Sequence, residues 1–434
     1  MVYMTHVAVL SLHTSPLDQP GVGDGGGLNV YVRELASALA RSGVTCDVYA
    51  RSCAPDTPHV VEVEPGFRVF NIEAGPLRPL THDEFILHLD EMADRITASV
   101  IEKNNDYDEP ISAIHANYWL SALVGHEVKH QLEIPLVTTF HTLEKVKVLQ
   151  GQGNPDIASS IRRIEREAMI ASCSDVVTAS CDAEVTDLTE LYGVDMARMA
   201  IISPGIEKSF FRSGRREFAK SALSAYIDFN YGINLGTSFP ENPLLLFVGR
   251  MQPLKSVDVA IGAFAMLEEF GITNAKLFLV GGPSGIGSGD WYESLRLCVR
   301  DAGMGNEAVF LPPQPHEVLS TFYRAADCVV VPSRSESFGL VALEAMACAT
   351  PVVAADVGGL STLIEDGKEG FLVEGHSAGD YAGVIAKVFS DPGLQNELGR
   401  HGLTKASGYT WHAAANRLNY LYRGIATNAI IKAC

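Results

Sequence analysis

The sequence predicts an α/β protein built from two doubly wound parallel sheets. Short apolar runs alternate with longer amphipathic stretches along nearly the whole chain, which is the pattern of parallel strands joined by crossover helices. Several of these runs end in glycine-rich or polar segments, as expected where ligands bind at the carboxyl ends of strands in such sheets. The length of 434 residues exceeds what one hydrophobic core normally serves and fits two domains of ordinary size.

Composition narrows the class of protein. Hydrophobic residues make up 47% and charged residues 20% of the chain, as in globular proteins, and a net charge of −19 without a basic block argues against nucleic acid or anionic membranes as partners. The eight cysteines form no C-x-x-C pair, which favours free thiols in a reducing cytoplasm. Because no apolar stretch approaches the roughly 20 residues of a membrane span, a cytoplasmic protein without membrane insertion is expected. The sequence leaves a homodimer open.

The first half begins with a predicted buried strand at residues 6–12 and a helix at residues 29–41. The segment between them, residues 21–27, matches G-x-G-x-x-G, and Asp47 stands near the end of the next strand, about where a dinucleotide fold would hold a ribose. This dehydrogenase interpretation is an alternative, but that fingerprint needs its first glycine at the strand end, and residues 13–20 intervene. A long glycine-rich loop before a helix instead suits a cradle for phosphate or sugar.

Polar clusters follow two later strands of the first half. Strands are expected at residues 67–72, 111–115, 136–140, 176–179 and 200–202. Two of these strands end in polar clusters, namely His115-Ala116-Asn117-Tyr118-Trp119 and Thr139-Phe140-His141-Thr142. Thr142 taken alone would be a helix cap, whereas two such clusters at one crevice favour binding. His141 could hydrogen-bond a sugar hydroxyl or be a structural histidine with its hydrogen bonds satisfied.

The second half places two cations at a strand end. After a turn-rich linker at residues 203–205 and a helix at residues 215–226, the strand at residues 244–248 runs into Gly249-Arg250, with Lys255 before a helix at residues 257–270. In so acidic a chain these cations are suited to a diphosphate, each charge-assisted contact contributing about 1.5–3 kcal/mol. The alternative is weak surface pairing with Asp258 or Glu268. Further strands are expected at residues 276–280, 309–311, 328–331 and 351–355.

The densest motif lies at residues 335–347. Glu336 and Glu344 stand eight residues apart, on either side of a Ser-Phe-Gly break that opens an apolar helix. The free backbone N–H groups of a helix start suit anions and ligand hydroxyls. Glu344 is expected about two turns into the helix, so that one acid holds sugar hydroxyls and the other a second ring. The alternative is an acidic first turn with one solvated glutamate.

This motif carries a resemblance to a known family. Glu336 and Glu344, followed by Thr350-Pro351-Val352-Val353-Ala354 and Gly358-Gly359-Leu360, resemble the signature of the retaining two-domain glycosyltransferases of the glycogen synthase and sucrose-phosphate synthase kind. The resemblance implies the GT-B fold, in which two facing Rossmann-like domains enclose an interdomain cleft. It implies an acceptor domain at residues 1–205, a donor domain at residues 206–410 and a helix at residues 411–434 that crosses back to the first domain. A nucleotide-sugar donor and a small polar acceptor are then the partners, with no cofactor.

The resemblance also assigns roles to individual residues. The glycine-rich loop covers the donor pyrophosphate, with Gly26, Gly27 and Asn29 at the matching positions, and Gly249 with Arg250 and Lys255 binds the diphosphate. Glu336 sits at the donor sugar, Glu344 binds the ribose, and Gln314 follows the segment that lies against the base, which leaves uracil and guanine undistinguished. The sugar is fixed by the helix start at Ser337, Phe338, Gly339 and Leu340. Front-face attack, with the leaving diphosphate taking the acceptor proton, makes His141, Arg250, Lys255 and Glu336 the implied catalytic set. No cluster of metal-ligand residues is evident in the sequence.

Within the family, the chain is most similar to the branch that moves N-acetylglucosamine from UDP to inositol 3-phosphate in mycothiol synthesis. The likeness runs through residues 13–17, 26–31, 118–121 and 335–343. That branch holds the acceptor phosphate with a Lys, a Tyr, a Thr and an Arg, and Tyr118, Thr142 and Arg162 match the last three. His82 stands at the Lys position, where a largely neutral imidazole would weaken a phosphate site.

Other acceptors and classes fit the same pattern. A sister branch from lincosamide antibiotic pathways transfers a GDP-activated octose to the sulfur of ergothioneine, a betaine of thiolated histidine. Its carboxylate could use Arg162, and its trimethylammonium group could use the aromatic face of Phe140 or Tyr118. A nucleotide-sugar epimerase shares the architecture but needs additional acids in the cleft. A non-catalytic nucleotide-sugar sensor is disfavoured by the intact glutamates and cations of the donor motif.

Overall fold

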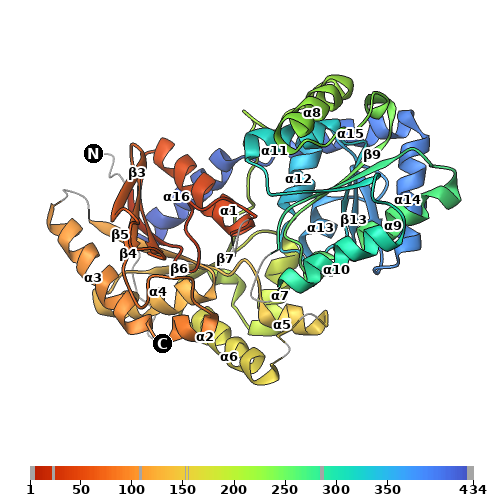
Figure 1. Cartoon of the computed structure of the whole chain (residues 1–434). Helices are drawn as coiled ribbons and strands as arrows, with labels where there is room; N and C mark the ends of the chain where they lie inside the picture. The colour runs from red at the N-terminus through yellow and green to blue at the C-terminus, as the bar shows by residue number, and fades with distance from the viewer. Residues whose placement is uncertain are drawn as a thin grey trace. The chain divides into compact units, whose positions relative to one another are not determined.

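Two compact units make up the chain (Figure 1). The computed structural model describes residues 5–21, 25–106, 110–151, 153–154, 156–283 and 288–427. The first unit comprises Met1–Asp18, Gly27–Gly205 and Trp411–Cys434, and the second comprises Gln19–Gly26 and Ile206–Thr410. Each contains one largely parallel sheet with helices packed on it, so the predicted α/β class with two doubly wound domains is confirmed.

The sheet of the first unit has eight strands in the order β3-β4-β2-β1-β5-β6-β7-β8. All neighbouring pairs are parallel except the antiparallel pair of β3 and β4 at one edge. From the central β1 the chain moves to β2 on one side and later returns to β5 on the other, so the strand order reverses beside β1 and a ligand crevice is expected at this point. The strands are β1 Thr5–Leu10, β2 Val44–Arg51, β3 Val60–Glu64, β4 Phe67–Ile72, β5 Ile111–Asn117, β6 Leu136–Thr139, β7 Val176–Ala179 and β8 Met199–Ile201.

Both faces of this sheet are covered. Along β1, Val7 and Val9 belong to one buried cluster, whereas Ala8 and Leu10 belong to the other, because successive side chains of a strand point to opposite faces. The first cluster includes α1 and the returning α16, and the second includes α3, α4 and α6. The helices of this unit are α1 Gly27–Arg41, α2 His82–Ile86, α3 Leu89–Asp106, α4 Trp119–Leu132, α5 Glu144–Leu149, α6 Ile157–Cys173, α7 Asp182–Tyr192 and α16 Trp411–Thr427, with a 3-10 turn at Met196–Arg198.

The second unit has a six-stranded, all-parallel sheet in the order β11-β10-β9-β12-β13-β14. Counted from β9, this is the strand order 3-2-1-4-5-6 of nucleotide-binding folds, which reverses between β9 and β12. The strands are β9 Leu244–Val248, β10 Lys276–Val280, β11 Ala308–Leu311, β12 Cys328–Val331, β13 Val352–Ala355 and β14 Gly370–Val373. The helices are α8 Arg216–Tyr231, α9 Val257–Ala265, α10 Ser288–Asp301, α11 His316–Ala325, α12 Leu340–Ala347, α13 Gly358–Leu363, α14 Ala378–Ser390 and α15 Pro392–Ala406, with 3-10 turns at Phe239–Glu241, Pro253–Lys255 and Met266–Phe270.

Some elements differ from the prediction. The helix expected at residues 257–270 is α9 followed by a 3-10 turn, and α8 extends to Tyr231, where Gly232 ends it with a φ of 66°. Among the described helices none is long and apolar enough to cross a membrane. Among the described residues, six cysteines are free thiols: Cys46, Cys53, Cys181, Cys298, Cys328 and Cys348. Cys173 is disulfide-bonded, so the expectation of free thiols is wrong for this residue.

Candidate active site

The end of β9 in the second unit is shaped by two glycines. Gly249 has a φ of 156° and Gly281, at the end of the neighbouring β10, has a φ of 151°. A Cβ atom on Gly281 would lie 1.8 Å from the carbonyl oxygen of Gly249. Only glycine therefore permits the two strand ends to come this close, and the chain then turns into Arg250 and the 3-10 turn that carries Lys255.

Lys255 and Glu336 meet where the strand order of the second unit reverses. The Nζ atom of Lys255 lies 2.5 Å from Oε2 of Glu336, and the Ser333 hydroxyl donates to the same oxygen at 3.3 Å. The side chains of Lys255 and Glu336 are 22% and 18% exposed, so ligands can reach both. Lys255 is predicted at the diphosphate and Glu336 at the donor sugar. The structure brings them together.

The glycine-rich loop is divided between the two units. Gly26 belongs to the second unit, where a Cβ atom on it would lie 3.4 Å from Nε of Arg250. Gly27 starts α1 in the first unit, and Asn29 is buried there with its amide donating to the carbonyl of Ser15 at 2.5 Å. Of the three predicted loop residues, Gly26 lies against a predicted diphosphate cation, whereas the Asn29 side chain braces the chain that follows β1.

A glycine pair holds the loop that carries Glu336. The amide of Gly359 donates to the carbonyl oxygen of Glu336 at 2.9 Å. A Cβ atom on Gly358 would lie 2.2 Å from that oxygen, and one on Gly359 would lie 2.4 Å from Cα of Phe338. Gly339 precedes α12 with a φ of 101°. The predicted segment from Ser337 to Leu340 is therefore a tightly packed helix start, and its binding of the sugar through backbone amides stays a prediction.

The predicted position of Glu344 needs a correction. Because α12 begins at Leu340, Glu344 lies just over one turn into the helix, not two. Its side chain is buried: Oε2 accepts from the hydroxyl of Tyr323 at 2.6 Å, and Oε1 lies 4.0 Å from Nε2 of His316. Burial raises the pKa of Glu344, against the smaller opposing effects of His316 and Tyr323. The alternative of a solvated glutamate is excluded.

Gln314 has a side chain that is fully engaged. Its Oε1 atom accepts from Tyr226 at 2.8 Å, and its Nε2 atom donates to Tyr231 at 2.9 Å and to the carbonyl of Pro312 at 2.7 Å. Both tyrosines lie on α8. The amide thus ties the segment after β11 to α8, and the role of this segment at the base stays a prediction.

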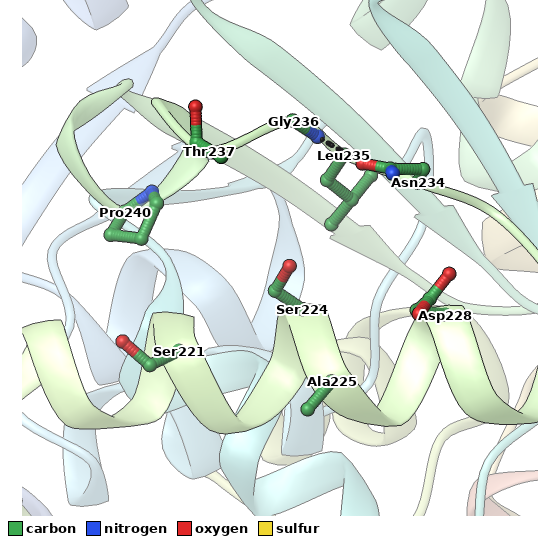
Figure 2. A pocket seen from close by; sticks show the side chains of 9 residues that line it. All are labelled: Ser221, Ser224, Ala225, Asp228, Asn234, Leu235, Gly236, Thr237 and Pro240. Atoms are coloured by element: carbon green, nitrogen blue, oxygen red, sulfur yellow. Dashed lines mark hydrogen bonds between the residues drawn. The ribbon is translucent and has the colours of Figure 1, made fainter.

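A shallow polar groove lies beside the same helix (Figure 2). It has a volume of about 330 Å³ and contains none of the predicted site residues. Its lining residues are Ser221, Ser224, Ala225, Asp228, Asn234, Leu235, Gly236, Thr237 and Pro240. One wall is α8 and the other is the chain that follows it, where Gly236 donates to Asn234 Oδ1 at 2.8 Å.

Two residues at strand ends of the first unit adopt unusual backbone conformations. Tyr118, directly after β5, has a φ of 77°, and His141, after β6, has a φ of 62°. Non-glycine residues rarely adopt positive φ, and such strain concentrates at functional sites. Nε2 of His141 lies 3.0 Å from Oδ1 of Asn117, and the Tyr31 ring packs edge-on at 4.8 Å. Burial, with a contribution from His115, lowers the pKa of His141 to about 3, so the imidazole is neutral.

His82, at the position of the family lysine, is part of an aromatic cluster. Its ring centroid lies 5.1 Å from that of His13, 6.1 Å from Tyr118 and 5.8 Å from Trp119. His13 and Tyr118 stack at 5.2 Å. Thr81 caps α2 directly before His82 through a capping box with Glu84. The structure thus places His82 next to the predicted acceptor residue Tyr118, among aromatic rings.

Arg163, the neighbour of the predicted Arg162, contacts the predicted acceptor residues Tyr118 and Thr142. Arg162 is 48% exposed and its nearest carboxylate, that of Asp156, is 3.7 Å away. The guanidinium of Arg163 lies 5.4 Å from the ring centroid of Tyr118 and its Nη2 donates to Oγ1 of Thr142 at 3.2 Å. The two arginines are adjacent on α6 and point in different directions, which a motif match does not reveal.

The charge of Arg163 is matched by two carboxylates. Its Nε atom lies 2.8 Å from Oε1 of Glu167, and its Nη1 atom lies 3.2 Å from Oε2 of Glu144. Burial opposes the charged form, but the interactions with Tyr118, Glu167 and Glu144 together raise the pKa of Arg163. The spacing of Arg163 and Glu167, four residues apart on one helix, is the sequence signal that could have identified this arginine.

The dinucleotide alternative is contradicted at Asp47. This carboxylate is fully buried, 3.0 Å from Nε2 of His6 and 2.7 Å from Nη2 of Arg68. Both partners come from neighbouring strands of the sheet. Because the Asp47 carboxylate is buried in the sheet and paired with these two side chains, it cannot reach a ribose. Within the described residues, no group of three or more His, Cys, Asp or Glu side chains is arranged to hold a metal ion.

Comparisons with known proteins cover nearly the whole chain. Residues 26–205 match the family model described as Glycosyl transferase 4-like domain, and residues 236–404 match Glycosyl transferases group 1. The chain is 41% identical over 425 residues to D-inositol 3-phosphate glycosyltransferase of Acidothermus cellulolyticus, covering 96% of this chain and 90% of that protein. Among solved structures, sucrose-phosphate synthase of Thermosynechococcus elongatus has a TM-score of 0.85 at 29% identity, covering 98% of this chain and all of that one. An Anabaena protein solved with UDP and glucose has a TM-score of 0.72 at 19% identity, a likeness of fold alone, covering 97% of this chain and 100% of that chain.

Proposed function

This chain belongs to the glycosyltransferases of the group 1 and 4-like type, and we propose that it moves N-acetylglucosamine from UDP to inositol 3-phosphate with retention at the transferred carbon. That the chain is a glycosyltransferase with the GT-B fold, as the sequence predicted, follows from its full-length relatives and structural neighbours. The donor, the acceptor and the stereochemistry are the proposal.

The observation that carries the transfer chemistry is the contact between Lys255 and Glu336. It joins a cation and an acid at the reversal of strand order in the second unit, where open α/β sheets bind nucleotides. We assign Lys255 and Arg250 to the diphosphate, whose negative charge grows as the sugar departs. Glu336 holds Lys255 in place and accepts hydrogen bonds from sugar hydroxyls. The departing diphosphate takes the acceptor proton, so no side chain is needed as base.

The acceptor proposal rests on Arg163, Thr142 and Tyr118. A guanidinium presents donors in a planar fork that matches phosphate geometry. The Thr142 hydroxyl and the Tyr118 ring flank it, so a phosphate held by Arg163 would also be within reach of a hydroxyl donor. Full-length relatives of this chain named D-inositol 3-phosphate glycosyltransferase support that acceptor.

A second acceptor is favoured by the surroundings of His82. Its neighbours His13, Tyr118 and Trp119 are aromatic. The guanidinium of Arg163, beside Tyr118, is already matched by two carboxylates. Aromatic faces attract quaternary ammonium groups. The second candidate is therefore the thiol-bearing betaine ergothioneine with a GDP-activated octose, as in lincosamide antibiotic biosynthesis.

The two candidates separate in one experiment. The purified chain is incubated with UDP-N-acetylglucosamine or a GDP-sugar, each with inositol 3-phosphate or ergothioneine, and products are detected by mass spectrometry. Conjugation of inositol 3-phosphate supports the first proposal. Conjugation of ergothioneine alone overturns it in favour of the second, and donor hydrolysis without any conjugate contradicts both.

The variant His82→Lys sharpens this test. It restores the cation of the inositol-phosphate branch next to Tyr118. If inositol 3-phosphate is the natural acceptor, KM for it falls in the variant, because a charge-assisted contact is added. The variant His88→Lys is a matched control, since His88 lies beyond the same short helix and pairs with Glu91. An unchanged KM in both variants would mean that the phosphate is not bound at His82.

A further inference from the structure

His141 is held by one hydrogen bond of defined polarity. Its Nε2 atom lies 3.0 Å from Oδ1 of Asn117, the last residue of β5. Asn117 is 1% exposed, so water does not compete for this contact. An amide oxygen only accepts hydrogen bonds, so Nε2 must carry the proton. In a neutral imidazole the other nitrogen, Nδ1, is then an acceptor.

The rest of the surroundings hold the ring in this orientation. Tyr31 on α1 packs edge-on against it at 4.8 Å, and the backbone of His141 is fixed at a φ of 62°. None of the described residues is hydrogen-bonded to Nδ1. The polarity of the Asn117 contact therefore decides what Nδ1 offers to a ligand.

We propose that Asn117 is a positioning residue that keeps His141 in its Nε2–H form, so that Nδ1 accepts a hydrogen bond from a hydroxyl of the bound sugar or acceptor. The inference deepens the proposed function and rests on it for the identity of that hydroxyl. The tautomer of the His141 imidazole does not depend on the substrate. Because Nδ1 then only accepts hydrogen bonds, it selects a hydroxyl donor and rejects an ether or a carbonyl at the same point.

The neutrality of the Asn117 amide is essential to this role. A carboxylate in its place would favour the protonated imidazolium, which has no acceptor. The titratable groups that face His141 are Tyr31 on α1 and His115 on β5. Glu184 on α7 acts on Tyr31. His115 contributes to the lowered pKa of His141, and the neutral amide of Asn117 supplies no negative charge that would offset this.

The test uses the full chain and two variants. In the wild type, nitrogen-15 NMR of the histidine side chains is expected to show His141 with its proton on Nε2 between about pH 6 and 8. In Asn117→Asp, kcat/KM is expected to fall about 10-fold to 100-fold at the acidic end, by analogy with groups that orient metal-bound histidines, and to recover as pH rises. The wild type should lack this acidic limb. Asn71→Asp is the control, because Asn71 is also buried, on β4, but its amide donates to the carbonyl of Pro58.

The possible results test the tautomer of His141 separately from the proposed function of the chain. A proton on Nδ1 of wild-type His141, or an Asn117→Asp profile parallel to that of the wild type, overturns the inference. If Asn117→Asp does not fold, the wild-type NMR measurement still decides the form of the ring. If no sugar acceptor is found for the chain, the proposed function fails, and the NMR result stands or falls independently of it.

Discussion

The ammonium of Lys255 lies 2.5 Å from the carboxylate of Glu336, across the point where the sheet of the second unit reverses its strand order. One residue follows β9 and the other follows β12, 81 positions later. Both side chains are partly exposed, and such ion pairs contribute little to stability. Stability alone therefore does not explain why the loops after β9 and β12 bring these two charges together. Such an arrangement is expected where the charges bind a ligand.

Replacing Lys255 should therefore affect activity far more than folding. In Lys255→Gln we expect kcat to fall at least about 100-fold, the loss seen when one group that stabilises developing charge is removed. The free energy of unfolding in urea should change by less than about 0.5 kcal/mol. The control is Lys276→Gln, a surface lysine on β10 that donates to the carbonyl of Asn306. Near-normal turnover in Lys255→Gln would remove the residue from the catalytic set.

The adjacent arginines of α6 provide a second, internally matched prediction. Arg163→Lys retains a charge but loses the planar fork that contacts Glu144, Glu167 and Thr142. We expect KM for the anionic acceptor to rise by about 10-fold or more and stability to fall, because a disrupted buried pair costs up to about 3–5 kcal/mol. Arg162→Lys should leave both within error, since Arg162 is exposed. Steady-state kinetics and urea unfolding check both variants, and the reverse ranking would restore the motif-based assignment.

Much of the fold could be predicted because the central strands are continuous apolar runs. β1 and β9 are buried on both faces, and such strands stand out from the helices that separate them. β3 was missed because Val60–Glu64 alternates valine with exposed or partly exposed glutamate at the sheet edge. β14 was missed because Gly370–Val373 is short and opens with glycine, packed so close to β13 that a Cβ atom would lie 2.4 Å from the carbonyl of Val352.

The sequence predicted which residue types make up the candidate site better than it predicted where their side chains point. The motif match assigned Arg162 alone, but adjacent helix positions differ by about 100° around the axis, and it is Arg163 that contacts Tyr118 and Thr142. The burial of Glu344 against Tyr323 depends on the packing of α11 against α12, which local sequence does not encode. Asn117 lay within a recognised polar cluster, yet its partner His141 comes from the next strand end, 24 residues later.

Two buried histidines predict how stability depends on pH. Burial lowers the pKa of His115 to about 3, and burial together with His115 lowers that of His141 to about 3, from ordinary values of 6.5. Above pH 6.5 both are neutral in the folded and unfolded chains, so they add no pH dependence. Below pH 6.5 the two histidines bind protons in the unfolded chain but not in the folded chain. The free energy of unfolding therefore falls by about 1.4 kcal/mol per pH unit for each histidine.

Urea unfolding between about pH 7.5 and 5 measures this slope. In His115→Gln, which can still hydrogen-bond Tyr422 and Thr139, the slope should be smaller by about one proton, or 1.4 kcal/mol per pH unit. The exposed His412 offers the matched control His412→Gln, whose slope should equal that of the wild type. Equal slopes in all three proteins would show that His115 takes up a proton in the folded chain.

Gly358 and Gly359 pack against the backbone of the loop that carries Glu336. Adding even a methyl group at Gly359 is therefore expected to reduce activity. A Cβ atom in Gly359→Ala would lie 2.4 Å from both Cα of Phe338 and the carbonyl oxygen of Ser337. Backbone atoms cannot move aside as a flexible side chain can, so the loop carrying Glu336 must shift. We expect a destabilisation of about 1–3 kcal/mol and a kcat reduced well beyond what that loss of stability explains. By contrast, Gly424→Ala in α16 meets nothing within 4 Å and should stabilise the chain by about 0.5–1 kcal/mol. If Gly359→Ala kept full turnover at the temperature of the assay, the position of Glu336 would not limit the reaction, and the proposed role of its contact with Lys255 would fail with it.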